Sequence, residues 1–182
     1  MSLKINYSNN SISKVSANTV LFTDEKFNIN NLKKYISNTE FSYINDLLKT
    51  NDIKKNILVF EINSKKKIIL ISIKKNLKNF DIENLGAEFF GRINYGKNSE
   101  YFLSSDSLPS KNENFIGHFL HGLKLKSYEF NKYKSKNETR LLSLNVIGNK
   151  NKFKAEQKLR FKALEEGTFF TRDLVSEPGN IL

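Results

Sequence analysis

The sequence KNILVFEINSKKKIILISIKK, residues 55–75, carries the strongest β signal of the chain. Two runs rich in β-branched residues, Ile57–Ile62 and Ile68–Ile73, flank the polar segment NSKKK. This pattern predicts a hairpin or two adjacent strands. Because both runs are almost continuously apolar, we expect these strands to be covered on both faces, which requires layers of helices.

The segments on either side of this stretch supply such helices and further strands. Apolar residues at helical spacing predict helices around residues 41–48, 81–93 and 112–130, and a long helix after residue 150. Shorter apolar stretches predict strands at 3–8, 19–22, 100–107 and 138–148. Because strands and helices alternate, we expect an α/β fold with a mixed β-sheet flanked by helices. A boundary near residues 149–151 divides the chain into a domain at 1–150 and a helical segment at 151–182.

Small residues in the predicted helices indicate close packing. Gly86, Gly91 and Gly96 fit neither the phosphate loop nor the dinucleotide fingerprint, so we assign them to helix packing and capping. Ala163 and Gly167 lie four residues apart, and we expect them to let a neighbouring backbone approach the last helix.

Composition limits the classes of protein that the chain can belong to. The 182 residues include no Cys, which excludes disulfides, thiolate metal ligands and a Cys nucleophile. No apolar run approaches the roughly 20 residues of a membrane helix, and the N-terminal MSLKINYSNN lacks the apolar region of a signal peptide. We therefore expect a cytoplasmic protein without a membrane partner.

The net charge of +11 has two interpretations. An anionic partner such as DNA is one, and the codon drift of an AT-rich genome is the other. The segment KLKSYEFNKYKSK interleaves aromatic residues with possible nucleic-acid contacts at Lys124, Lys126, Lys132, Lys134 and Lys136. We favour a helix end whose aromatic residues enter the core while the lysines stay in solvent.

The residues by themselves contain no complete catalytic set. His118 and His121, at i and i+3 of a predicted helix, could share a metal, but no third ligand is evident nearby. We favour packed or surface histidines. No Gly-x-Ser-x-Gly nucleophile motif occurs, although SSDS at 104–107 brings Ser and Asp together.

The C-terminal sequence FTRDLVSEPGNIL, residues 170–182, is typical of the connection between a helix and a following element. Pro178 disfavours helix at Glu177, so the last helix is expected to end near Val175 or Ser176. Gly179 and Asn180 are turn residues. We expect this segment to lead into a further element.

Two motifs in this third of the chain resemble the leucyl aminopeptidase (cytosol aminopeptidase) family. The first is a Gly-x-x-Leu-x-x-Tyr-x-Phe-x-x-Tyr-Lys-like stretch, and the second is Arg-Asp-Leu-x-x-x-Pro-x-Asn. Gly179 and Ser176 depart from the residues that are common in the family, Pro and Asn. The matching positions are Gly122, Tyr128, Phe130, Tyr133, Arg172, Asp173, Leu174, Pro178 and Asn180.

This resemblance implies an N-terminal, macro-domain-like domain and a connecting helix that precede a catalytic domain. It implies a parent that releases N-terminal amino acids from peptides as a homohexamer, with two divalent ions (Zn²⁺, Mn²⁺ or Mg²⁺) held in the catalytic domain. The metal-binding signature Asn-Thr-Asp-Ala-Glu-Gly-Arg is absent here, so no catalytic residue, metal ligand or cofactor is assigned to this chain. The implied partner is the missing catalytic domain, and Phe161, Phe169 and Phe170 are expected to pack partly on it.

Two alternatives of other classes stay open at this stage. Some bacterial members of the family bind DNA, which keeps a DNA-binding module possible. A macro-like nucleotide binder is the other, although the chain has no glycine-rich phosphate loop.

Overall fold

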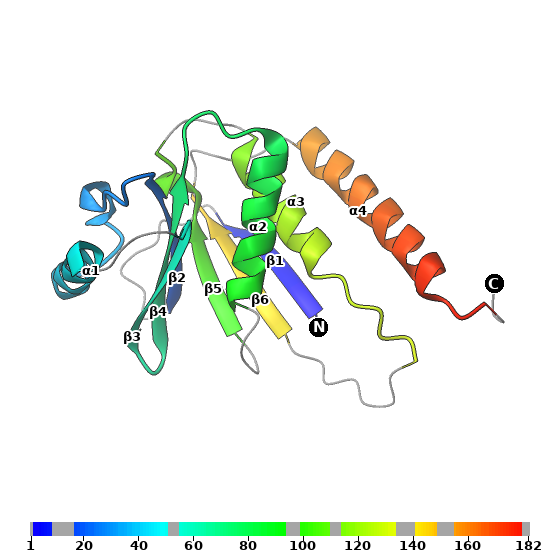
Figure 1. Ribbon diagram of the computed structural model, residues 1–182, viewed down its shortest axis with the longest axis horizontal. Coiled ribbons are helices and arrows are strands. Elements are labelled where there is room, and N and C mark those ends of the chain that lie inside the picture. The colour runs from blue at the N-terminus through cyan, green and yellow to red at the C-terminus, as the bar shows by residue number, and fades with distance from the viewer. Residues whose placement is uncertain are drawn as a thin grey trace.

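The computed structural model describes residues 2–8, 17–50, 55–93, 99–109, 114–133, 141–148 and 155–179 (Figure 1). It contains a six-stranded sheet in the order β1-β6-β5-β2-β4-β3. All neighbouring pairs are parallel except β3 and β4, which form the antiparallel hairpin that residues 55–75 predict. The predicted mixed α/β fold is confirmed, whereas the likeness to macro domains stays a prediction. The strands are β1 (Ser2–Ser8), β2 (Asn18–Asp24), β3 (Ile57–Asn63), β4 (Lys66–Ile73), β5 (Ser99–Ser104) and β6 (Leu141–Ile147).

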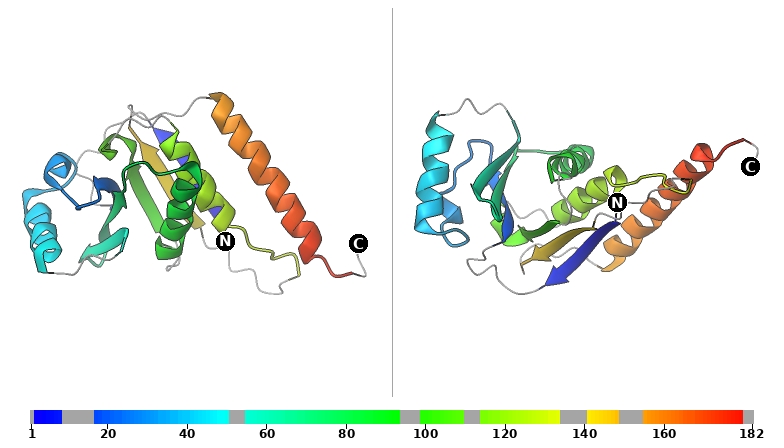
Figure 2. Two further views of the ribbon diagram at one scale, coloured as in Figure 1. Left: turned by 45° about the horizontal axis from the view of Figure 1, so that its top comes forward. Right: turned by 90° about the horizontal axis from the view of Figure 1, so that it is seen from below.

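Helices cover both faces of this sheet. Helix α1 (Asn38–Thr50) and the short η1 (Asn30–Leu32) lie on one face, and α2 (Asn79–Ile93) and α3 (Phe115–Lys126) lie on the other (Figures 1 and 2). The central strands alternate accordingly, because successive side chains point to opposite faces. In β4, Ile69 and Ile71 pack toward α2 and α3, while Ile68 and Leu70 pack toward α1. The two separate cores therefore explain why these strands are apolar at nearly every position.

Helices α2 and α3 pack at backbone distance through two glycines. A Cβ added to Gly86 would lie 1.9 Å from the carbonyl oxygen of Phe119, and one added to Gly122 would lie 1.9 Å from that of Glu83. The packing role expected of Gly86 is thus supported. A Cβ at Gly91 meets nothing within 4 Å, so Gly91 has no such role, and Gly96 lies outside the described residues.

Helix α4 (Ala155–Ser176) lies outermost, beside α3 and away from the sheet's central strands (Figures 1 and 2). It ends at Ser176, as the position of Pro178 predicts. Ala163 and Gly167 are both exposed and a Cβ at Gly167 meets nothing within 4 Å, so the close approach expected at these positions stays a prediction. None of the described helices combines the length and hydrophobicity of a membrane-spanning segment.

Two predicted boundaries need correction. The strand expected at 100–107 ends at Ser104, and Ser105–Ser107 form the 3₁₀ turn η2 because their hydroxyls bond to neighbouring backbone. The helix expected at 112–130 ends at Lys126, where Ser127 bonds back to the carbonyl of Lys124. The predicted strand residues 138–140 lie outside the described residues.

Candidate functional site

The two sequence motifs meet at the α3–α4 interface, which we define as α4 together with α3 and the following segment Ser127–Tyr133. The Tyr128 hydroxyl donates to Asp173 Oδ1 at 2.7 Å. The Arg172 guanidinium donates to the carbonyl of Leu125 at 2.6 Å and lies 5.5 Å from the centre of the Tyr128 ring. Residues that lie 45 and 47 positions apart along the chain are thereby joined.

A second group of contacts lies beyond the end of α4. Glu177 accepts hydrogen bonds from Lys132 and from the Tyr133 hydroxyl. Hydrogen bonding by Lys132, and then by Tyr133, lowers the pKa of Glu177. The same carboxylate raises the pKa of Lys132 and that of Tyr133. The segment after α3 is therefore tied to the segment after α4.

The aromatic residues of this segment do not enter the core, so the interpretation of residues 124–136 as a core-facing helix end is wrong. Tyr128 packs on Phe169 with ring centres 5.4 Å apart, and Phe130 packs on Tyr133 at 5.8 Å. Tyr133 is 51% exposed. Helix α3 has already ended, so Tyr128 packs on α4 and Phe130 packs on Tyr133.

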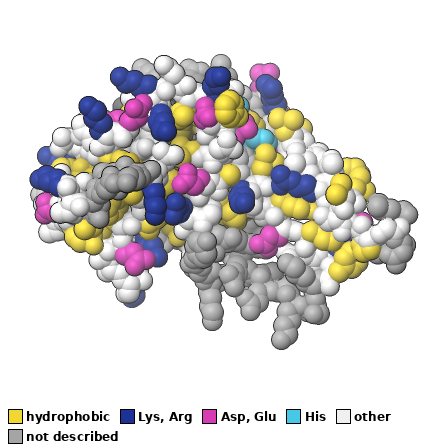
Figure 3. All heavy atoms as spheres, viewed as in Figure 1, with side chains coloured by type: hydrophobic (Ala, Val, Ile, Leu, Met, Phe, Trp, Pro, Cys, Tyr) yellow, Lys and Arg dark blue, Asp and Glu magenta, His cyan; other side chains and the backbone are white. Residues whose placement is uncertain are grey.

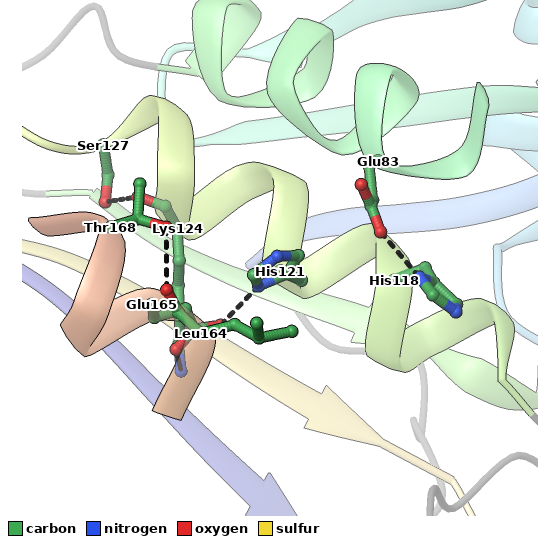
Figure 4. Close-up of polar contacts among 8 residues, drawn as sticks. All are labelled: Glu83, His118, His121, Lys124, Ser127, Leu164, Glu165 and Thr168. Atoms are coloured by element: carbon green, nitrogen blue, oxygen red, sulfur yellow. Dashed lines mark hydrogen bonds and ion pairs between the residues drawn. The ribbon is translucent and has the colours of Figure 1, made fainter. Parts of the chain in front are cut away.

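A buried carboxylate occupies the middle of the interface (Figure 4). Glu165 is the one buried residue of α4, all of which the structure describes, and it is 5% exposed. His121 Nδ1 lies 3.1 Å from its Oε1, and Lys124 Nζ donates to its Oε2 at 2.8 Å. Tyr7 belongs to strand β1. Desolvation, and secondarily the charge of Glu165, raises the pKa of Tyr7 to about 12.

The two histidines bind different carboxylates and do not form a shared ligand pair. His118 Nδ1 lies 2.7 Å from Glu83 of α2, while His121 binds Glu165 of α4 (Figure 4). The Phe161 ring lies against both imidazoles, with centre distances of 5.0 and 4.9 Å. Among the described residues, no cluster of three or more His, Asp or Glu side chains could hold a metal ion.

The lysines proposed as nucleic-acid contacts are only partly available. Lys124 and Lys132 pair with Glu165 and Glu177, whereas Lys126 is exposed. Lys134 and Lys136 lie outside the described residues. On the face that carries α2, basic side chains are interspersed with acidic ones (Figure 3). The described lysines of this segment therefore form no dedicated basic patch.

The remaining motif residues point away from the core. Leu174 is 42% exposed and Pro178 is exposed. Asn180 lies outside the described residues. Hydrophobic side chains gather over α4 in Figure 3.

A cleft of about 410 Å³ opens where α2, α3 and α4 meet. Its lining includes the motif residues Gly122, Tyr128 and Arg172, with Lys126 at one side. Tyr128 and Arg172 already bond to the chain itself and connect α3 with α4, whereas Gly122 packs α3 against α2.

The usual ligand position of an α/β sheet is filled by the chain's own hydroxyls. Strands β2 and β5 lead into helices on opposite faces, and ligands bind at the carboxyl ends of such strands. The ladder between them covers only Asn18–Val20 of β2. Beyond it, Ser107 Oγ accepts the Phe22 N–H at 2.9 Å and donates to the carbonyl of Ser104 at 2.7 Å. This position gives no support to a nucleotide-binding function.

Two carboxylates, Glu165 and Glu177, escaped the sequence reasoning. In the sequence both look like ordinary solvated residues, and their partners lie 41 to 45 positions away. The one available signal was an acidic residue amid the apolar positions Phe161 and Phe169 of α4.

Comparisons with known proteins show which proteins the chain resembles. No protein-family model matches the chain. A probable cytosol aminopeptidase of Dinoroseobacter shibae is 42% identical over 64 residues, which cover 34% of this chain and 12% of that protein. A solved tomato leucine aminopeptidase mutant aligns with a TM-score of 0.65 and 18% identity. The resemblance to the leucyl aminopeptidase family is confirmed.

The match to the tomato leucine aminopeptidase extends over almost the whole of this chain. The tomato structure matches 99% of this chain but only 39% of its own. The bottromycin maturation enzyme BotP, solved in complex with Mn, matches 90% of this chain and 32% of its own, with a TM-score of 0.58 and 10% identity. The chain thus spans well under half the length of the relatives that it matches, and these structures establish a shared fold.

Proposed function

We propose that this chain is the N-terminal, non-catalytic domain of a two-metal leucyl aminopeptidase, with residues 1–150 as the domain and 151–182 as the connecting segment. The observation that carries the proposal is the match of 99% of this chain to 39% of the tomato enzyme. The α3–α4 interface supports it, because residues of the two motifs contact each other there. The parent would release N-terminal amino acids from peptides in the cytoplasm.

Chemistry in this proposal belongs to the catalytic domain. Two divalent ions, Zn²⁺, Mn²⁺ or Mg²⁺, would be held there, and a two-metal site requires several converging ligands. The domain described here would support hexamer assembly and access to that site. The outward apolar side of α4, with Leu159 68% and Phe170 64% exposed, supports a contact between α4 and the catalytic domain.

The test is to isolate the native product with an antibody raised against this chain. We expect a species much heavier than 21.1 kDa that releases leucine from leucine 4-nitroanilide and loses this activity with a chelator. The 182-residue chain, assayed with Mn²⁺ or Zn²⁺, should release none. A native product of 21.1 kDa without associated peptidase activity would contradict the proposal.

The alternative is a DNA-binding module, which the net charge of +11 favours. It requires an affinity for duplex DNA that falls steeply with salt, since neutralised phosphates release counterions. Fluorescence anisotropy at low and moderate salt decides the matter. Binding that is flat in salt, or absent at low salt, eliminates this alternative.

A further inference from the structure

Both hydrophobic cores are complete without α4. The cluster beneath α2 and α3 and the cluster beneath α1 draw their described buried residues from segments that end at Ile147. Phe161 and Phe169 pack instead on imidazole and phenol rings at the outer side of α3 and Ser127–Tyr133. Neither described core therefore includes a residue of α4.

The contacts that hold α4 are mostly polar and differ in their access to solvent. At the ends, Gln157 bonds to Asn114, and Asp173 bonds to Tyr128, all at exposed positions. Exposed polar contacts contribute little, because water competes for both partners. Inside α4 the buried carboxylate is Glu165, whose side chain is 7% exposed, and beyond the end of α4 the Glu177 side chain is 10% exposed.

Burial makes the Glu165 contacts cooperative. A carboxylate inside the protein is stable only while its partners are in place, because the desolvated charge has no water to replace them. His121 and Lys124 supply these partners from one face of α3, and Lys158 of α4 lies over the Tyr7 ring of β1 at 4.6 Å. A small displacement of α4 would leave the buried charge of Glu165 without its partners, whereas full separation would expose this charge to water. Two states, docked and separated, are thereby favoured over intermediate ones.

We propose that Glu165 is a latch: its contacts with His121 and Lys124 hold α4 docked on α3, and their loss releases α4 as a unit from an intact α/β body. The latch goes beyond the aminopeptidase proposal and does not depend on it, since it is a property of this chain alone. The latch determines whether the outward side of α4 is held at a fixed orientation relative to the α/β body.

Hydrogen–deuterium exchange of the full chain tests the latch, with Glu165→Gln as the variant. Removing a hydrogen-bonded charge is expected to increase the opening of α4 roughly tenfold to a hundredfold. A separated helix of this length is only marginally stable in water, so its amides should exchange correspondingly faster. Peptides from β2 and β4 should exchange as in the wild type.

The matched control is Glu166→Gln, one residue further along the same helix. Glu166 is 68% exposed and lies 3.7 Å from Lys162, so α4 should stay protected in this variant. Two results for Glu165→Gln would overturn the latch: unchanged exchange in α4, or equal acceleration in α4, β2 and β4.

A double-mutant cycle with Lys124→Met provides a second readout that a general loss of stability would not produce. If the two side chains act as one contact, the double variant should open α4 by much less than the product of the two single effects. Strictly multiplicative effects would also overturn the proposal.

Discussion

At the scale of single residues, Gly122 sets how closely α2 and α3 approach. A Cβ at this position would lie 1.9 Å from the Glu83 carbonyl oxygen, so the backbones of two helices must separate. We expect Gly122→Ala to lower the free energy of unfolding by about 1–3 kcal/mol or more, the usual cost of overpacking. Urea unfolding monitored by circular dichroism measures this loss.

Gly91→Ala is the matched control on α2, because a Cβ there meets nothing within 4 Å. Removing a helical glycine should stabilise the protein by about 0.5–1 kcal/mol. Equal effects of the two substitutions would mean that helix propensity, not the close approach, determines the role of Gly122.

The same residue scale shows why the candidate site was only partly predictable. The spacing of His118 and His121 was visible in the sequence, but their partners Glu83 and Glu165 lie 35 and 44 positions away. Only the packing of three helices decides that each imidazole meets its own carboxylate. Periodicity within one helix carries no information about this choice.

At the scale of elements, helix α1 is fixed at its N-terminus by one carboxylate. The Ser37 N–H donates to Glu40 Oε2 at 2.9 Å and the Glu40 N–H donates to Ser37 Oγ at 3.2 Å, which is a capping box. Glu40 Oε1 also lies 2.6 Å from Lys66 Nζ of β4, with both side chains nearly buried. Helix α1 is thereby attached to the hairpin.

This attachment should depend on pH in one direction. Burial raises the pKa of Glu40, but hydrogen bonds from Lys66 and Ser37 outweigh it, and the folded pKa lies below the ordinary 4.5. The contribution of Glu40 is therefore complete above pH 4.5 and is lost as pH falls through the folded pKa. We expect Glu40→Gln to cost about 2–3 kcal/mol at pH 7 and progressively less below pH 4.5, measured by urea unfolding across that range.

The exposed pair of Glu61 and Lys67 provides the control for this prediction. Its side chains are 70% and 40% exposed, so Glu61→Gln should change stability far less than Glu40→Gln does. If Glu40→Gln costs as little as Glu61→Gln, the Lys66 contact does not anchor α1.

The elements also show where sequence patterns succeed and fail. Helix α2 was predictable because its apolar residues follow the helical period and enter a core. The β3–β4 hairpin was predictable because two apolar runs rich in β-branched residues flank a polar segment. In α4 the apolar residues are also periodic, but Leu159, Phe170 and Leu174 face outward and the buried position is Glu165. A hydrophobic period identifies a helix without stating what its apolar side contacts.

At the scale of the whole molecule, α4 turns Glu165, Phe161 and Phe169 toward α3 and Tyr128, and an apolar side outward. Leu159, Phe170 and Leu174 are 68%, 64% and 42% exposed and lie near one another around the helix. Exposed apolar area of this kind drives association. We expect the chain to self-associate as its concentration rises, and Phe170→Ser to weaken this association without loss of stability, as measured by sedimentation velocity.

Phe169→Ser separates the outer side of α4 from the inner one. Phe169 packs on Tyr128 at 5.4 Å, so its loss should loosen α4 and leave the outer apolar side intact. Association that survives Phe170→Ser but disappears with Phe169→Ser would contradict the assignment of the outer side as the contact surface. A chain that stays monomeric at its highest soluble concentration would do the same, because the exposed side would then be too small to drive association.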